Sequence, residues 1–171
     1  MDNIKYPIGH FEVTEEISKN ELNQWIDEIT VFPTLLNEVV GNLNEEEQKL
    51  TYREGAWTIK QLVHHIADGQ INYYTRIKLA LTEDNPIIKP FEENEWASLV
   101  DSELPLTASI KIIEGIHERF SYLLKNLTEE QLNKIFSHPV TGKQTIPTTI
   151  GFCAWHIRHH LAHIKIALEN K

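Results

Sequence analysis

Nine histidines are the residues of this 171-residue chain best suited to bind a metal ion or to transfer protons. His156 and His160 are four residues apart, a spacing that places two side chains one turn apart on the same face of a helix. Such a pair can bind one transition-metal ion, although it is also common in helices that bind none. The HExxH pattern of zinc proteases is absent, because residues 157–159 are Ile, Arg and His and include no glutamate base.

Helical phase predicts which histidines can face the inside of a helical bundle. At about 100° per residue, His65 lies roughly 80° from the centre of the apolar stripe of its helix, whereas His64 lies close to 180° from it. On the last helix, His160 and His156 lie about 80° and 120° from the apolar centre, and His159 points nearly straight outward. The phases therefore predict one metal site made by His65, His156 and His160, with His64 and His159 facing away from the interior.

Three further side chains near these ligands could contribute to the chemistry. Asp68 lies one turn after His65 and could orient that imidazole or act as a base, or it could be an ordinary solvated carboxylate. His163 continues the edge of His160 and could be an outer ligand, a proton carrier or a hydrogen-bond partner of a ligand. Cys153 could be a fourth ligand, which would close the site, or a buried inert thiol.

Four long amphipathic helices are predicted to position these residues. Ser18 with Glu21, and Thr58 with Gln61, form capping-box patterns, and apolar residues recur at helical spacing after each of them. The expected helices cover about residues 18–39, 58–82, 107–126 and 147–168, the first of them bent at Pro33. A short helix is expected after Thr128, followed by a turn or small hairpin around residues 138–143.

This pattern predicts an all-α fold, a four-helix bundle formed by a single domain over residues 1–171. Residues 83–106 contain three prolines and should form one long crossover between the second and third helices, with a turn around residues 93–99. Residues 1–17 should form an extended arm that lies on the body of the bundle.

Charge and composition exclude several classes of partner. The formal net charge is −9 and no dense block of Lys or Arg offsets it, so binding to nucleic acid or to an anionic membrane surface is not expected. No stretch is long and apolar enough to span a bilayer, and the first residues do not resemble a signal peptide, which predicts a cytoplasmic protein. The single cysteine excludes an intramolecular disulfide and an all-cysteine zinc site.

Several sequence blocks together resemble the DinB/YfiT-like superfamily, and most closely its bacterial YfiT proteins, over nearly the whole chain. These blocks are YPIG at residues 6–9, YREGAWT at 52–58, QLVHHIAD at 61–68, RIKLALTE at 76–83, and the segment from Trp155 to His163. The resemblance implies a four-helix bundle, a homodimer, and one divalent metal ion per subunit, zinc or nickel, bound by three histidines.

The same resemblance assigns His65, followed by Ile-Ala, as the ligand of the second helix, and His156 and His160 as the ligands of the last one. The chain departs from the family pattern at His163, where many members carry glutamine. It also departs at residues 54–56, which read Glu-Gly-Ala where close relatives often carry two adjacent glycines.

Three protein ligands would leave an open coordination position, which is typical of catalytic rather than structural metal sites. The first hypothesis is a metal-dependent hydrolase in which this position activates water toward a small-molecule substrate. The alternative is a thiol S-transferase that binds a low-molecular-weight thiol of the bacillithiol type and attacks an electrophile. Arg53, Lys60 and Arg76 could receive a carboxylate of such a thiol, or they could be ordinary surface charges. A third hypothesis is a non-catalytic protein that binds a metal or another ligand.

Overall fold

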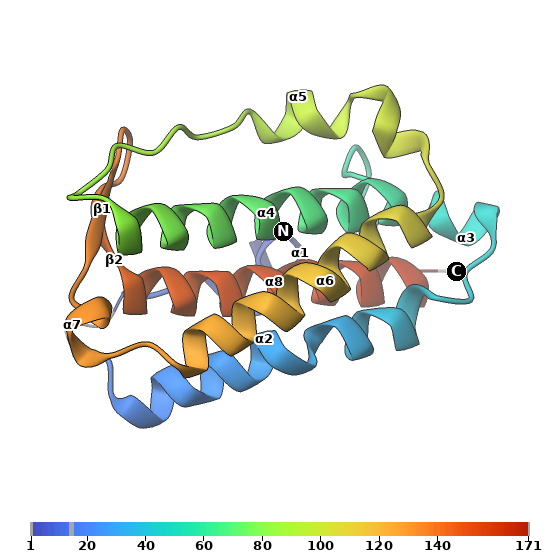
Figure 1. Cartoon of the computed structure of the whole chain (residues 1–171). Helices are drawn as coiled ribbons and strands as arrows, with labels where there is room; N and C mark the ends of the chain where they lie inside the picture. The colour runs from blue at the N-terminus through green and yellow to red at the C-terminus, as the bar shows by residue number, and fades with distance from the viewer. Residues whose placement is uncertain (1, 14–15, 171) are drawn as a thin grey trace.

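The computed structural model describes residues 2–13 and 16–170, and four long helices dominate it (Figure 1). These helices are α2 (Lys19–Val40), α4 (Ile59–Thr82), α6 (Leu106–Lys125) and α8 (Ile146–Glu169). The shorter elements are α1 (Asp2–Lys5), α3 (Glu45–Gln48), α5 (Glu93–Ala97), a 3₁₀ helix η1 (Val100–Glu103), α7 (Glu129–Leu132), β1 (Ile135–His138) and β2 (Gly142–Thr145). The predicted all-α bundle is confirmed, with one two-stranded antiparallel hairpin between α7 and α8.

The helix starts follow from local capping. Ser18 caps α2 and Thr58 caps α4, each in a capping box in which the side chain at the third helical position bonds back to the cap residue. Thr145 caps α8, and Pro147 occupies its first turn, where the missing N–H costs no helical hydrogen bond. These three starts match the sequence predictions.

Pro33 lies inside α2 without ending the helix. Proline has no N–H, so the carbonyl of Ile29, four residues earlier, loses its usual helical partner. The buried side chain of His117 on α6 supplies a replacement, with its Nδ1 donating to Ile29 O at 2.6 Å. His117, to which no role was assigned from the sequence, therefore satisfies the carbonyl that Pro33 leaves without a helical partner.

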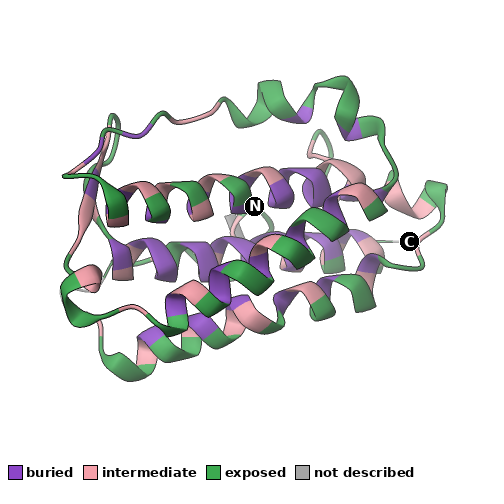
Figure 2. Cartoon of the chain, in the orientation of Figure 1, coloured by how far each residue is buried: buried purple, intermediate pink, exposed green. Residues whose placement is uncertain are grey.

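Helices α2 and α4 each pack against both α6 and α8, which places α2 and α4 at opposite corners of the bundle. Figure 2 shows the buried faces of the helices turned toward one another, and the exposed faces turned outward. The largest fully buried side chains are apolar and come from all four helices, including Phe32, Ile66, Phe120 and Ile157. Because α4 and α8 are direct neighbours, residues far apart in sequence meet between them.

The crossover of residues 83–105 runs along α4 and carries α5 and η1, which both contact that helix (Figure 1). It is tied to the hairpin by two backbone bonds, from Ile88 N to Ser137 O at 3.0 Å and from Ser137 N to Pro86 O at 2.9 Å. The predicted long connection is confirmed, and it covers α4 as a second layer.

The N-terminal arm lies on the body of the bundle, as predicted, and contacts α8, but it is not extended throughout. Asp2–Lys5 is helical, and Tyr6 to Gly9 form a turn closed by a bond from Gly9 N to Tyr6 O at 3.0 Å. Gly9 has φ 75°, a conformation that glycine adopts without strain. The arm is held by Trp155 Nε1, which donates to Gly9 O at 3.1 Å, whereas residues 14–15 of the predicted arm lie outside the described residues.

Across residues 2–13 and 16–170, no helix has both the length and the apolar character needed to cross a membrane.

Candidate metal centre

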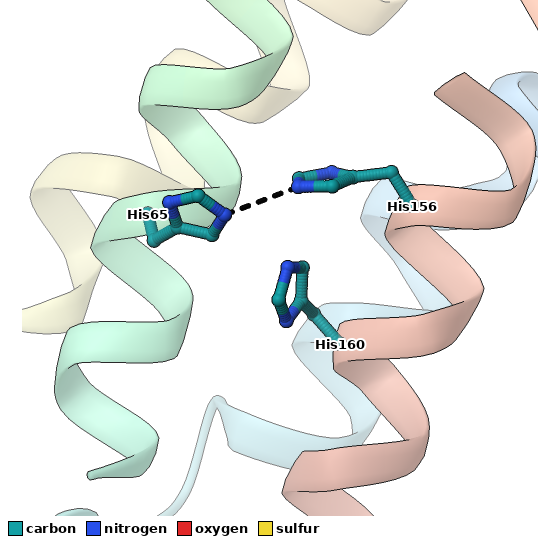
Figure 3. A group of neighbouring side chains, drawn as sticks. All are labelled: His65, His156 and His160. Atoms are coloured by element: carbon teal, nitrogen blue, oxygen red, sulfur yellow. Dashed lines mark hydrogen bonds between the residues drawn. The ribbon is translucent and has the colours of Figure 1, made fainter. Parts of the chain in front are cut away.

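Three imidazoles meet between α4 and α8. His65 comes from α4, and His156 and His160 come from consecutive turns of α8 (Figure 3). One nitrogen of each ring lies within 4.8 Å of a nitrogen of the other two, and His65 Nε2 is 3.1 Å from His156 Nε2. The ring centroids are 4.5 to 5.1 Å apart. The structure thus brings together the three residues that helical phase selected as ligands.

Burial keeps these imidazoles neutral. It lowers the pKa of His65 to about 4, and it lowers the pKa values of His156 and His160 well below the ordinary value, with a further contribution from the neighbouring histidines. A protonated imidazole has no free lone pair, so only the neutral form can bind a metal ion. The three rings are therefore in the state that coordination requires at neutral pH.

The donor set fits a divalent transition-metal ion. Two nitrogens that each lie about 2.0–2.1 Å from one ion at a tetrahedral angle are separated by roughly 3.3 Å, close to the 3.1 Å between the Nε2 atoms of His65 and His156. The Nδ1 atoms of His156 and His160 are buried and have no hydrogen-bond partner among the described residues. No protein group of the described residues therefore fixes a proton on either Nδ1 atom, and a bound ion would influence which tautomer each ring adopts.

Gly69 makes room for the cluster. A Cβ atom at this position would lie 2.9 Å from Cε1 of His156, closer than real Cβ contacts. Trp57 packs against His65 with ring centroids 4.7 Å apart, and Tyr73 meets His156 edge-on at 5.4 Å. Aromatic packing thus restricts the rings of His65 and His156, and the missing side chain of Gly69 leaves space for His156. Nothing in the sequence pattern alone indicates this role for Gly69.

His64 and His159, which helical phase predicted to face away from the interior, are both buried, because other segments of the chain cover them. His64 lies beneath the crossover, with its Nδ1 2.7 Å from Ser109 Oγ and its Nε2 3.0 Å from Leu104 O. His159 stacks on Trp155 with ring centroids 4.5 Å apart, beneath the N-terminal arm. Helical phase locates a residue relative to the bundle axis but does not detect segments that cover the outer face.

A second histidine group lies along α8 and shares one member with the first. Ligand nitrogens of His159, His160 and His163 also lie within 4.8 Å of one another. His163 stacks on Tyr52 with centroids 3.8 Å apart, and its Nε2 lies 3.2 Å from Lys5 O. The roles predicted for His163, as outer ligand or proton carrier, stay predictions.

Asp68 is half-buried, and its pKa is raised to about 6, chiefly by burial and secondly by the nearby carboxylate of Asp101. Within residues 2–13 and 16–170, no hydrogen bond joins it to His65, and it belongs to neither histidine group. A pKa near 6 suits a general base, but the structure does not connect this carboxylate to the cluster. Its catalytic role stays a prediction.

Cys153 fits the inert alternative. Its thiol is buried and donates to Gln70 Oε1 at 3.1 Å, and burial raises its pKa to about 12. It belongs to neither group of potential metal ligands in the described part of the chain. The two histidine groups therefore keep an all-nitrogen donor set.

The fold and the site define a class of protein, a four-helix bundle with a buried histidine cluster between two of its helices. A sequence model of the DinB superfamily matches residues 28–164, and the chain belongs to this family. A protein of Halalkalibacterium halodurans named "Putative metal-dependent hydrolase" is 48% identical over 168 residues, 98% of each chain. A protein of Oceanobacillus iheyensis with the same kind of name is 46% identical over 167 residues.

Among solved structures, the chain is similar to YfiT from Bacillus subtilis, described as "a probable metal-dependent hydrolase with an unusual four-helix bundle topology". The TM-score is 0.94 and the identity 36%, covering 98% of this chain and 97% of YfiT. A mycothiol-dependent maleylpyruvate isomerase matches with a TM-score of 0.63 and 19% identity, covering 85% of this chain and 60% of the isomerase. At that identity the second likeness concerns the fold alone.

Proposed function

We propose that this protein is a metal-dependent hydrolase in which His65, His156 and His160 hold one divalent ion, zinc or nickel. The observation that carries the proposal is the cluster of three buried, neutral imidazoles from two helices. The names of the relatives from H. halodurans and O. iheyensis and the description of YfiT support it. A divalent ion held there would polarise the bond under attack and lower the pKa of a water molecule or a thiol.

The residues around the cluster prepare the site for a substrate. Trp57 and Tyr73 pack on the rings and restrict their rotation, which keeps the ligand nitrogens convergent. A cavity of about 530 Å³ reaches His156 and is large enough for a small organic molecule. The chain itself thus supplies ligands, ring positioning and a binding space beside them.

Metal analysis of purified variants tests the ligand assignment. The wild-type protein should contain one equivalent of ion, and His65→Ala, His156→Ala and His160→Ala should each lose most of it, because two imidazoles hold an ion far more weakly than three. His64→Ala is the matched control, since His64 is also a buried histidine of α4 but bonds Ser109 and Leu104 instead.

Binding of the ion by the second histidine group, His159, His160 and His163, would contradict this ligand assignment. If His159→Ala or His163→Ala loses the ion while His65→Ala keeps it, the ion binds along α8 alone and the proposed centre is wrong. His160 belongs to both groups, so its variant does not distinguish them.

Thiol transfer is a second candidate reaction, favoured by the presence of a second cavity. This cavity, of about 240 Å³, touches His160, whereas the larger one touches His156. Its walls include Lys5 and Arg53, which suit the carboxylate of a small thiol such as bacillithiol or glutathione. Two cavities that touch different histidines of one cluster could hold two reactants.

A substrate panel separates the two reactions. Zinc-loaded and nickel-loaded protein would be incubated with esters, amides and phosphate esters, and then with a chlorinated electrophile with and without a thiol. In the transfer, the sulfur bonds to carbon, chloride leaves and the thiol proton goes to solvent. Turnover without thiol supports hydrolysis, whereas turnover that requires the thiol rejects hydrolysis as the main activity.

A further inference from the structure

The larger cavity is a mostly apolar space between α4 and α8, bordered by the β1–β2 hairpin, the crossover and the N-terminal arm. Its volume is about 530 Å³. Four phenylalanines from four different segments contribute to its walls, namely Phe11, Phe91, Phe136 and Phe152. Such walls favour the hydrocarbon or aromatic body of a ligand, because apolar surface leaves water on binding.

One face of α4 forms a continuous wall from the histidine cluster into this cavity. Gly69, Tyr73 and Arg76 follow His65 by 4, 8 and 11 residues, a spacing that keeps all four on one side of a helix. At 1.5 Å per residue, the Cα atoms of His65 and Arg76 are separated by roughly 16 to 17 Å along the axis. Within the cavity wall, Gly69 lies against His156, and Arg76 follows Gly69 by seven residues, roughly 10–11 Å along the axis, so an imidazole and a guanidinium border different parts of the cavity.

Arg76 is a half-buried cation with no anion at contact distance. Its Nε atom is buried and has no hydrogen-bond partner, and no carboxylate of the described residues lies within 4.0 Å of its guanidinium nitrogens. The guanidinium lies over the Tyr73 ring, 5.5 Å from its centroid. Arginine stays charged in proteins, so this burial has a cost that a bound anion would offset.

Glu93 of α5 is the acidic side chain nearest to this charge at the cavity wall. It lies close enough to affect Arg76 electrostatically, but it forms no ion pair with it. Glu93 therefore lowers the positive potential in the cavity without occupying the donors of the guanidinium. Removing its charge should strengthen the binding of an anion there.

We propose that this cavity binds a substrate with an apolar body and a terminal anionic group, a carboxylate or a phosphate, which pairs with Arg76. The bond to be cleaved then lies at the opposite end, beside His156. The position of that bond rests on the proposed hydrolase function, whereas the recognition of the anion does not. The inference thus gives the substrate class of the same site.

Binding of three probes to zinc-loaded protein tests the proposal by isothermal titration calorimetry. The probes are 4-phenylbutyrate, its neutral amide 4-phenylbutanamide, and 3-phenylpropyl phosphate. An ion-paired hydrogen bond to Arg76 should make the carboxylate bind roughly 10-fold to 100-fold more tightly than the amide. The phosphate shows which of the two anions the site prefers.

Arg76→Gln should abolish the preference for the anions, and Arg76→Lys should keep part of it. Arg119→Gln is the matched control, because Arg119 also lies over a tyrosine, Tyr74, at 5.6 Å but is exposed and outside the cavity. If Arg76→Gln does not fold, Glu93→Gln provides the test without altering the arginine, and it should bind 4-phenylbutyrate more tightly.

A carboxylate could instead bind the metal ion, and chelator-treated protein separates the two explanations. A preference that persists without metal and disappears in Arg76→Gln supports the proposal. A preference that disappears with the metal and persists in Arg76→Gln overturns it, as does equal binding of acid and amide to the wild type. If the protein binds no ion and cleaves no ester, the hydrolase proposal is wrong. The Arg76-dependent preference for the anionic probes over the amide should still be observed in that case.

Discussion

At the scale of single residues, the absence of a side chain at Gly69 leaves room for the His156 ring of the candidate centre. Alanine there would place its Cβ 2.9 Å from His156 Cε1. That ring is buried, faces His65 and His160, and has Tyr73 beside it, so it cannot move away without changing the direction of its nitrogens. Adding a single methyl group at Gly69 should therefore lower the affinity of the site for a metal ion.

We expect Gly69→Ala to weaken metal binding by about 10-fold to 100-fold, the range found when the surroundings of a metal ligand are altered. The measurement is a competition titration of zinc against a chromophoric chelator. Gly115→Ala is the control, because Gly115 lies in α6 with open space around its Cβ position. That variant should bind zinc normally and unfold with about 0.4–1 kcal/mol more free energy. Equal zinc affinity of both variants would show that Gly69 does not shape the site.

The meeting of the three candidate ligands could be predicted from the sequence, whereas most of what surrounds them could not. His65, His156 and His160 have suitable helical phases, and the motifs around them resemble a known family, so two independent arguments selected the same residues. Arg76 was already a candidate to receive a carboxylate, but its place in the wall of the larger cavity depends on how α4 packs against α8 and the crossover. The role of Gly69 depends on His156 lying opposite it, and neither helical phase nor composition contains that information.

At the scale of elements, the crossover is anchored to the bundle by a buried histidine. His64 bonds Ser109 near the start of α6 and the backbone of Leu104 just before it, which links α4 to both. Its pKa is lowered, first of all by burial, so the ring is neutral at pH 7 and has one donor and one acceptor nitrogen for these two partners. The crossover therefore covers His64, and His64 in turn binds the crossover through Leu104.

His64→Ala should cost about 1–3 kcal/mol in the free energy of unfolding, because Ser109 and Leu104 lose a buried partner and a cavity remains. Urea denaturation measures this difference. His10→Ala, at an exposed histidine of the arm, is a suitable control and should change stability little. An unchanged midpoint for His64→Ala would contradict the anchoring role.

Local signals accounted for the long helices and missed some of the short elements. The capping boxes at Ser18 and Thr58 and the apolar periodicity after them are contained within a few residues of chain, and so they are visible in sequence. Asn44 with Glu47 is an equally complete capping box that starts α3, a helix that was not among those predicted. The burial of His64 and His159 depends instead on segments distant in sequence, the crossover and the arm.

At the scale of the whole molecule, buried neutral histidines make stability depend on pH. His117 is an example remote from the metal centre, since it is 1% exposed and bonds Ile29 on α2. Burial lowers its pKa from 6.5 to about 4, with the bond to Ile29 O partly opposing this shift. In the unfolded chain its pKa is ordinary, so below pH 6.5 the unfolded state takes up a proton that the folded state does not.

The stabilising contribution of neutral His117 is therefore complete above about pH 6.5 and is lost as the pH falls toward 4. Comparing His117→Asn with the wild type isolates this effect, because the other histidines titrate in both proteins. The stability advantage of the wild type over the variant should shrink by about 3 kcal/mol between pH 7.5 and pH 4. Urea denaturation at several pH values, with metal removed from both proteins, measures it. A difference that stays constant with pH would mean that His117 is not held neutral.

The two helices that carry the candidate ligands, α4 and α8, are far apart in the sequence. His65 and His156 are separated by 91 residues, so neither helix can form the centre until the intervening chain has been made and α8 has docked. During synthesis, a chain shorter than 156 residues would contain only His65 of the three imidazoles, and a single imidazole binds an ion far more weakly than three. Capture of the ion would then mark the moment when the last helix joins the others, and it would oppose their separation afterwards.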